Sequence, residues 1–191
     1  MDFKAQSIPD ILVIELKEHR DKRGYFVETY RQDKLLEILG YKVDFIQDNQ
    51  SKSTKGVLRG LHFQVPPFAQ SKLVQVIQGA VLDVAVDIRK GSPNFGKYVS
   101  TKLSAENKKQ MFIPRGFAHG YIVLTDSATF SYKVDSYYSP EHERGLFFDD
   151  PQVNIDWLLP KEEHSLSEKD TKHPGLKDLE DYFYFDQNYY G

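Results

Sequence analysis

The chain of 191 residues fits a single domain, and a domain of this size buries roughly 70% of the surface that its unfolded chain exposes. Lys and Arg number 25 against 28 Asp and Glu, so the formal net charge of −3 offers no basic field to a nucleic-acid backbone or an anionic membrane. The absence of cysteine excludes disulfides, thiolate catalysis and Cys-ligated zinc. The first residues lack a signal-peptide pattern, and no apolar stretch reaches the length of a membrane span. We therefore expect a cytoplasmic protein without nucleic-acid or membrane partners.

The predicted elements begin with a helix and continue as strands. Asp33 is the expected N-cap of the helix, Gly40 its C-terminal residue, and the leucines and isoleucine between them form a helical stripe. A strand is predicted at residues 72–78, followed by a bend at Gly79. Residues 82–88 alternate between apolar and polar or small side chains, a pattern typical of a half-buried strand. Further strands are predicted at residues 98–103, 110–113, 120–124 and 128–135, with turn residues between them.

This spacing of short strands favours an antiparallel sandwich or barrel over βαβ units. No linker divides the chain, so we expect one domain over residues 1–191. From about residue 165 the pattern indicates one or two short helices, with Pro174 and Gly175 between them. The aromatic run at residues 182–185 is expected to pack on the barrel or on a second subunit.

Two histidines stand out because each lies beside glycines and charged residues at a strand edge. They are His62 and His119, whereas the other histidines (His19, His142, His164 and His173) lie in polar surroundings and are interpreted as ordinary surface or core residues. The Pro114-x-Gly116-x-x-His119 spacing resembles the second motif of the cupin superfamily, a double-stranded β-helix or jelly roll. The first cupin motif would run from Gly56 through His62 to Gly79.

The residues of these motifs do not form a complete metal-ligand set. Metal-binding cupins carry a second histidine and an acidic residue in the first motif, but here these positions hold Gln64 and a residue near Gln70 or Lys72. A protonated lysine cannot be a ligand. One histidine per motif and no carboxylate therefore predict no catalytic metal.

The same residues suit acid–base chemistry. His62 can accept a proton near neutral pH, and Lys72 supplies a positive charge for a developing enolate oxygen. Tyr132 lies on a predicted strand and could donate a proton from another wall. From the residues alone, Tyr132 fits a barrel-wall aromatic at least as well.

Six motifs, in order, closely resemble the dTDP-4-dehydrorhamnose 3,5-epimerase family over nearly the full chain. Each motif is weak alone, but together they are specific. They are Arg23-Gly24-Tyr25-Phe26-x-Glu28, Gln47-Asp48-Asn49-x-Ser51, Gly56-x-Leu58-Arg59-Gly60-Leu61-His62-Phe63-Gln64, Lys72-Leu73-Val74, Pro114-x-Gly116-Phe117-Ala118-His119-Gly120 and Tyr132-Lys133.

The resemblance implies a mainly β, cupin-type jelly roll with a few short peripheral helices. It also implies epimerisation at C3 and C5 of dTDP-4-dehydro-6-deoxy-D-glucose to dTDP-4-dehydro-L-rhamnose through an enolate, without metal or cofactor. By resemblance, His62 is the general base, Asp170 orients it, Lys72 stabilises the C4 enolate, and Tyr132 returns a proton on the opposite face.

The resemblance further implies a set of substrate-binding residues. Arg23 and Arg59 match diphosphate contacts, and Tyr138 matches the aromatic that stacks on thymine, with Tyr137 as its alternative. The remaining implied positions are Phe26, Glu28, Gln47, Asp48, Asn49, Lys72, His119, Glu143 and Lys169. In this family the segment from Arg23 to Glu28 crosses to the partner subunit, which implies a homodimer.

Three alternatives remain open on the sequence. A mono-epimerase acting at C3 or C5 only, in an antibiotic-sugar pathway, would share the catalytic residues. A metal cupin, such as a dioxygenase or phosphosugar isomerase, is opposed by Gln64 and Lys72. A non-catalytic nucleotide-sugar-binding protein would keep the binding residues and lose the acid–base residues, which are present here.

Overall fold

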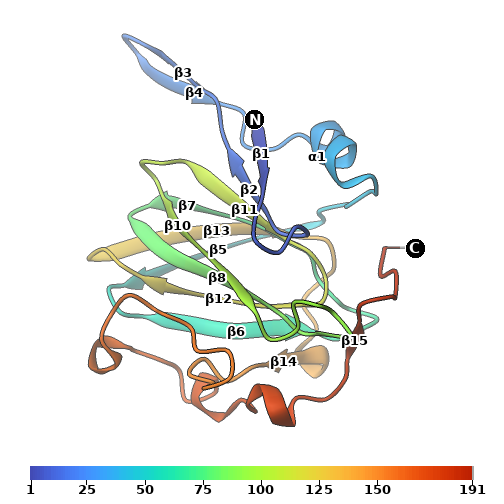
Figure 1. The fold of residues 1–191 in the computed structure, drawn as a ribbon. Coiled ribbons are helices and arrows are strands. Elements are labelled where there is room, and N and C mark those ends of the chain that lie inside the picture. The colour runs from blue at the N-terminus through green and yellow to red at the C-terminus, as the bar shows by residue number, and fades with distance from the viewer. Residues whose placement is uncertain (191) are drawn as a thin grey trace.

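The computed structural model describes residues 1–190 and folds them into a barrel of two facing antiparallel sheets (Figure 1). In spatial order, one sheet contains β1 (Asp2–Ala5), β2 (Leu12–Glu15), β11 (Lys109–Ile113), β7 (Lys72–Gln78), β13 (Ser127–Val134) and β5 (Gln47–Thr54). The facing sheet contains β10 (Tyr98–Ser104), β8 (Ala80–Asp87), β12 (Phe117–Val123), β6 (Leu58–Gln64) and β14 (Glu143–Gly145). The predicted mainly β jelly roll is confirmed.

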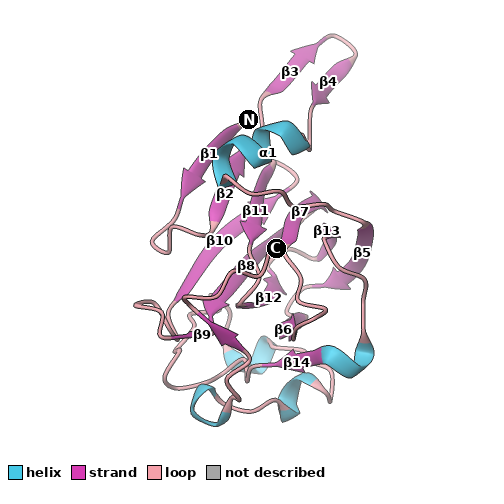
Figure 2. Ribbon diagram, turned by 90° about the vertical axis from the view of Figure 1, so that its right-hand side faces the viewer, coloured by secondary structure: helices cyan, strands magenta, loops and turns pink. Residues whose placement is uncertain are grey.

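Smaller elements surround the barrel. The hairpin of β3 (Glu18–Asp21) and β4 (Gly24–Val27) extends away from it, as Figure 2 shows. The short helices are α1 (Gln32–Leu39) and the 3-10 turns η1 (Pro140–His142), η2 (Lys161–Glu163), η3 (Asp170–Lys172) and η4 (Leu176–Asp178). A parallel pair joins β9 (Arg89–Lys90) to β15 (Phe183–Tyr184). Within residues 1–190, no helix combines the length and apolar character needed to cross a bilayer.

The helix α1 corrects one detail of the prediction. It begins at Gln32, so Asp33 lies in its first turn rather than at the N-cap, and Arg31 occupies the cap without a side-chain cap bond. Asp33 instead accepts a hydrogen bond from Nε of Arg31 at 3.0 Å. Gly40 ends the helix in the left-handed conformation, as expected, with its N–H bonded to the carbonyl of Leu36.

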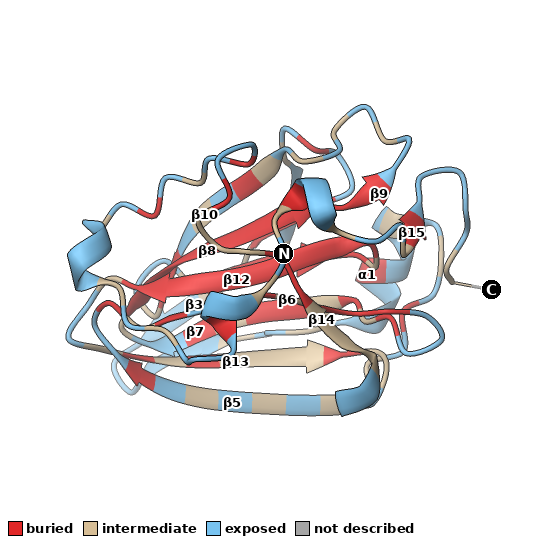
Figure 3. Cartoon of the chain, turned by 90° about the horizontal axis from the view of Figure 1, so that it is seen from below, coloured by how far each residue is buried: buried red, intermediate tan, exposed pale blue. Residues whose placement is uncertain are grey.

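The strand β8 differs from its prediction in exposure. The sequence alternation indicates a half-buried strand, but every residue of β8 is buried (Figure 3). Its apolar Leu82 and Val84 face an outer cluster that is covered by the C-terminal segment, whereas Val81 and Ala85 belong to the core between the sheets. Because side chains alternate along a strand, Asp83 and Asp87 lie on the same side as Val81 and Ala85. The polar face of this strand is therefore the interior face.

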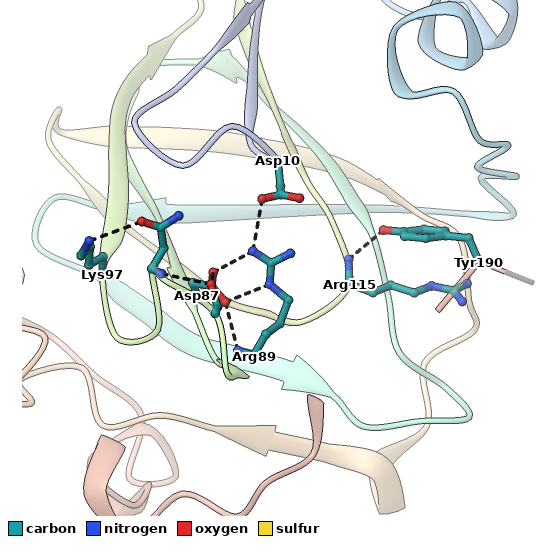
Figure 4. A network of polar contacts seen from close by, with 8 residues as sticks. Asp10, Asp87, Arg89, Lys97, Arg115 and Tyr190 are labelled. Carbon is teal, nitrogen blue, oxygen red and sulfur yellow. Dashed lines mark hydrogen bonds and ion pairs between the residues drawn. The ribbon is translucent and has the colours of Figure 1, made fainter. Parts of the chain in front are cut away.

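Polar side-chain contacts and apolar packing link neighbouring segments to the barrel. The Arg89 guanidinium donates to Asp87 at 2.7 and 2.9 Å and to Asp10 at 3.2 Å (Figure 4). The Asp150 carboxylate accepts the N–H of Leu176 at 2.8 Å, and Phe183 is buried in the outer cluster. The bond to Leu176 and the burial of Phe183 hold the segment after residue 165 over the five-stranded sheet.

Candidate active site

A cavity of about 490 Å³ opens between the two sheets. Strands β6 and β12 of one sheet and β5, β7 and β13 of the other line it, and residues 165–170 form a further wall. Ser165 holds that wall in place, because its N–H and carbonyl bond to the backbone of Gly56 and Leu58 at 2.9 Å each. The lining residues are Ser51, Val57, Leu58, Arg59, His62, Lys72, His119, Tyr121, Phe130, Tyr132, Ser165, Leu166, Ser167, Lys169 and Asp170.

His62 and Asp170 form a hydrogen-bonded pair in this cavity although they are far apart in sequence. Nε2 of His62 lies 2.6 Å from Oδ1 of Asp170, whose side chain is almost fully buried. Burial raises the pKa of Asp170, but the imidazoles of His173 and His62 outweigh it and hold that pKa below its usual range. An ionised carboxylate only accepts, so Nε2 of His62 carries the hydrogen and Nδ1 has a free lone pair. The pair fixes the tautomer that a general base requires.

A glycine allows β6 to lie close to β12 beside His62. Gly60 has a φ of +126°, and a Cβ at this position would lie 2.6 Å from the Cα of Gly120 and 2.8 Å from the carbonyl oxygen of His119. A side chain at residue 60 would therefore push apart the two strands that carry His62 and His119.

Lys72 lies on β7, in the sheet facing His62, and is partly exposed to the cavity. Burial lowers the pKa of its ammonium to about 8, against the opposing influence of the Asp83 and Glu143 carboxylates. Lys72 is thus still mainly charged at neutral pH, and its charge is poorly solvated. An anion that forms beside this ammonium in the cavity is therefore strongly stabilised by it.

His119 is held by a buried carboxylate behind the cavity wall. Its Nε2 lies 2.8 Å from Oδ1 of Asp83, and both side chains are buried. Burial lowers the pKa of His119, so its imidazole is neutral and donates to the Asp83 carboxylate. The other oxygen of Asp83 has no hydrogen-bond partner among the described residues. Burial raises the pKa of Asp83, and the neighbouring His119 and Lys72 oppose this shift.

Tyr132 lies on β13 within a group of aromatic side chains. Phe130 stacks on Tyr121 with ring centroids 4.1 Å apart, and the Tyr132 ring lies 5.9 Å from Phe130. The hydroxyl of Tyr121 shares a hydrogen bond of 2.8 Å with Ser51. Burial raises the pKa of the Tyr132 phenol, so it keeps its proton at neutral pH. Tyr132 is therefore chemically a proton donor rather than a base.

A polar network continues from the cavity to its rim. Lys169 pairs with Glu143, and the hydroxyl of Tyr138 donates to Glu143 Oε2 at 2.7 Å. The N–H of Tyr138 in turn donates to Gln47 at 3.1 Å, and Gln47 donates to Asn49 at 2.9 Å. The Tyr138 ring itself is exposed. The network thus connects an exposed aromatic surface to the interior of the cavity.

The cavity carries positive charge despite the negative net charge of the chain. Arg59, Lys72 and Lys169 all line it. Arg59 is exposed, and its Nε donates to Ser53 Oγ at 3.2 Å. This bond does not use the two terminal nitrogens of its guanidinium. Guanidinium forks match phosphate oxygens.

Eight of the twelve expected substrate-binding residues are not among the residues that line this cavity. Four of them, Gln47, Asn49, Tyr138 and Glu143, belong to the network at its rim, and the other four lie apart from it. Arg23 and Phe26 are exposed on the β3–β4 hairpin, and Glu28 follows it. Asp48 alternates with Gln47 and Asn49 on β5, and it bonds to Lys133 at 2.9 Å on the exposed side. Within one chain the structure does not bring these four residues to the cavity.

Some lining residues were not predicted as site residues from the sequence. Ser51 belongs to one of the six motifs and Tyr121 directly follows another, and the alternation of side chains along their strands could have placed them beside Asn49 and His119. Ser167 and Leu166 have no such signal, because they lie in an irregular segment. His173 was interpreted as an ordinary polar histidine, yet its Nε2 lies 3.6 Å from Oδ1 of Asp170.

The fold and the site define a cupin-type jelly-roll protein with acid–base groups and cations in the barrel cavity. The family model described as dTDP-4-dehydrorhamnose 3,5-epimerase matches residues 5–178. The chain belongs to this family.

Individual relatives agree with this assignment. A dTDP-4-dehydrorhamnose 3,5-epimerase from Shigella flexneri is 53% identical over 183 residues, which cover 96% of this chain and 99% of the relative. A 3,5-epimerase structure from Legionella pneumophila Philadelphia 1, in complex with dTDP-4-keto-L-rhamnose, has a TM-score of 0.93 and 44% identity, with 97% of this chain and 99% of that chain covered. A 3'-monoepimerase from Streptomyces bikiniensis has a TM-score of 0.87 and 31% identity, with 94% and 92% covered.

Proposed function

We propose that this protein epimerises C3 and C5 of dTDP-4-dehydro-6-deoxy-D-glucose to give dTDP-4-dehydro-L-rhamnose. The observation that carries the proposal is the position of His62 and Tyr132 on opposite sheets of one cavity. Inversion at carbon requires a base on one face of the sugar ring and an acid on the other. A proton removed and returned by the same group would restore the starting configuration.

The proposed reaction uses the side chains in sequence. Nδ1 of His62 accepts the proton from the carbon next to the C4 ketone, and the electrons of the C–H bond form the enolate. The ammonium of Lys72 stabilises the negative oxygen at C4, and the Tyr132 phenol gives its proton to the opposite face of the carbon. Exchange with solvent then restores His62 and Tyr132. Each acid–base group contributes roughly 10²–10⁴-fold, so the stabilised enolate supplies much of the remaining rate enhancement.

The nucleotide part of the substrate fits the polar and cationic surroundings. Arg59 and Lys169 would hold the diphosphate, and the exposed ring of Tyr138 would stack on thymine. The Legionella structure with a dTDP-sugar supports a substrate of this class. His119, Gln47, Asn49 and Glu143 complete the proposed contacts.

We also propose that the active protein is a homodimer. Arg23, Phe26 and Glu28 lie on or beside a hairpin that extends away from its own barrel, so they would contribute to the partner's cavity rather than their own (Figure 1). A single domain over residues 1–191 and a cytoplasmic location likewise stay predictions from the sequence. Sedimentation velocity tests the dimer, and Arg23→Ala should weaken dTDP binding although it lies outside the cavity of its own chain.

The 3,5-epimerase is favoured over a mono-epimerase. The chain is 53% identical to the Shigella 3,5-epimerase and 31% identical to the Streptomyces 3'-monoepimerase. The decisive experiment incubates the protein with the 4-keto substrate in D₂O and follows both carbons by NMR. Deuterium at C3 and C5 with an L-rhamno product is expected. Deuterium at neither carbon would refute the proposed function, and deuterium at one carbon would establish a mono-epimerase.

A further inference from the structure

Three side chains that could bind a metal ion meet at the wall of the cavity. The donor atoms of His62, Asp170 and His173 all lie within 4.8 Å of one another. Oδ1 of Asp170 lies 2.6 Å from Nε2 of His62 and 3.6 Å from Nε2 of His173. The two imidazole rings are nearly perpendicular, with an interplanar angle of 85°, so they approach the carboxylate from different directions.

The nitrogen of His173 that faces this cluster is Nε2, which lies 3.6 Å from Oδ1 of Asp170. The side chain of His173 is only 11% exposed, and its Nε2 is buried without a hydrogen-bond partner among the described residues. A bound ligand would give this buried nitrogen a partner. The ring packs against Gly145 and needs the glycine there, because a Cβ at residue 145 would lie 2.3 Å from its atoms. Gly145 pairs with His62 across β14 and β6, so the same strand pair positions both histidines.

The donor set identifies the class of ion. Two imidazole nitrogens and one carboxylate oxygen, with a fourth position open to water, form the ligand set of many zinc sites. Two donors around a tetrahedral zinc are separated by about 3.3 Å. The 3.6 Å between His173 and Asp170 is close to this value, the His62–Asp170 contact has to widen, and the two imidazole nitrogens, which lie within 4.8 Å of one another, have to take a similar separation. Mg²⁺ and Ca²⁺ prefer oxygen donors and suit this site poorly.

We propose that His62, Asp170 and His173 bind Zn²⁺ or a similar divalent transition metal, and that this binding inhibits the enzyme. The inhibition rests on the proposed function. Coordination through Nε2 uses the lone pair of that nitrogen, so the ring hydrogen moves to Nδ1. Nδ1 is then unable to accept a proton from the substrate. The metal therefore blocks the base without occupying the sugar-binding part of the cavity.

Calorimetry tests the metal site independently of activity. Zn²⁺ is titrated into the full chain after removal of metal with EDTA, and one equivalent is expected to bind. His173→Gln should weaken the affinity more than about tenfold. His19→Gln, a matched substitution on the exposed hairpin, should leave it unchanged. Equal affinity in all three proteins, or no binding to the native chain, would overturn the proposal.

Deuterium exchange at C3 and C5 tests the inhibition, with each variant compared with its own metal-free rate. Zn²⁺ should inhibit the native chain and His19→Gln at concentrations that spare His173→Gln, whereas Mg²⁺ should inhibit none of them. Zinc bound at this site with an unchanged exchange rate would refute the inhibition. A chain that binds zinc here but shows no exchange even after EDTA contradicts the proposed function and supports the metal site.

Discussion

The alkaline side of the pH–rate profile should report the charge of Lys72. Burial lowers the pKa of this ammonium from 10.5 to about 8. With that value, about 90% of the lysine is charged at pH 7 and about 10% at pH 9. If only the charged form stabilises the enolate, kcat/KM, which reports the pKa values of the free enzyme, should fall about tenfold between these pH values. Tyr132 does not produce this decline, because burial raises its pKa and it remains a protonated phenol.

The assay is the initial rate of deuterium exchange at C3 and C5 at substrate concentrations well below KM, from pH 6.5 to 9.5. Lys72→Arg is the matched control, since guanidinium stays charged throughout this range. Its rate should be lower but nearly independent of pH. Asp83→Asn should move the decline of the otherwise native protein to lower pH, because the Asp83 carboxylate raises the pKa of Lys72.

The titration of Lys72 does not unfold the protein at high pH, so unfolding caused by this group cannot explain the expected fall in rate. Between pH 8 and 10.5 the unfolded chain binds more protons at residue 72 than the folded chain, so this group's contribution to the free energy of unfolding rises with pH. A native rate that stays constant from pH 7 to 9, or the same decline in Lys72→Arg, would refute the assignment of the enolate-stabilising charge to Lys72.

Other predictions concern the base, the acid, the diphosphate contact and the buried ion pair. His62→Asn should lower exchange at both carbons at least about 100-fold while dTDP still binds by calorimetry; an unchanged rate would exclude His62 as the base. Tyr132→Phe should keep exchange at the carbon but lose net inversion by NMR, and full inversion would exclude Tyr132 as the acid. Arg59→Ala should cost about 1.5–3 kcal/mol of dTDP binding, and an unchanged Kd would place the diphosphate elsewhere. Arg89→Met should lower the free energy of unfolding in urea by about 3–5 kcal/mol, because it leaves the buried Asp87 unpaired, and a smaller effect than about 1 kcal/mol would contradict that pairing.

Local sequence patterns predicted many strands but not the environment of each face. The strand at residues 72–78 was predicted with its observed bounds, since its apolar run and the bend at Gly79 are local signals. The alternation in β8 correctly indicated two different faces. It could not show that the segment after residue 165 covers the apolar face. Nor could it show that Asp83 bonds to His119 and Asp87 to Arg89 in the interior.

The candidate site was predictable where its residues lie in motifs. His62, Lys72, His119 and Tyr132 are on regular strands whose spacing carries information. Asp170 contacts His62 from 108 residues away, and its assignment came from family resemblance rather than from any pattern. His173 was missed for the same physical reason, because its approach to Asp170 depends on an irregular segment and on the space above Gly145.

The placement of Asp170 has a consequence for the order in which activity is acquired. The strands that carry His62, Lys72 and Tyr132 all precede residue 135, whereas the carboxylate that orients His62 arrives with η3, and its segment is fastened through Leu176 and Phe183. A ribosome-bound chain halted at residue 160 would already contain the sheets of the barrel and still lack the partner of its base. In the proposed reaction, the group that orients the base is therefore supplied by the last part of the polypeptide to be synthesised.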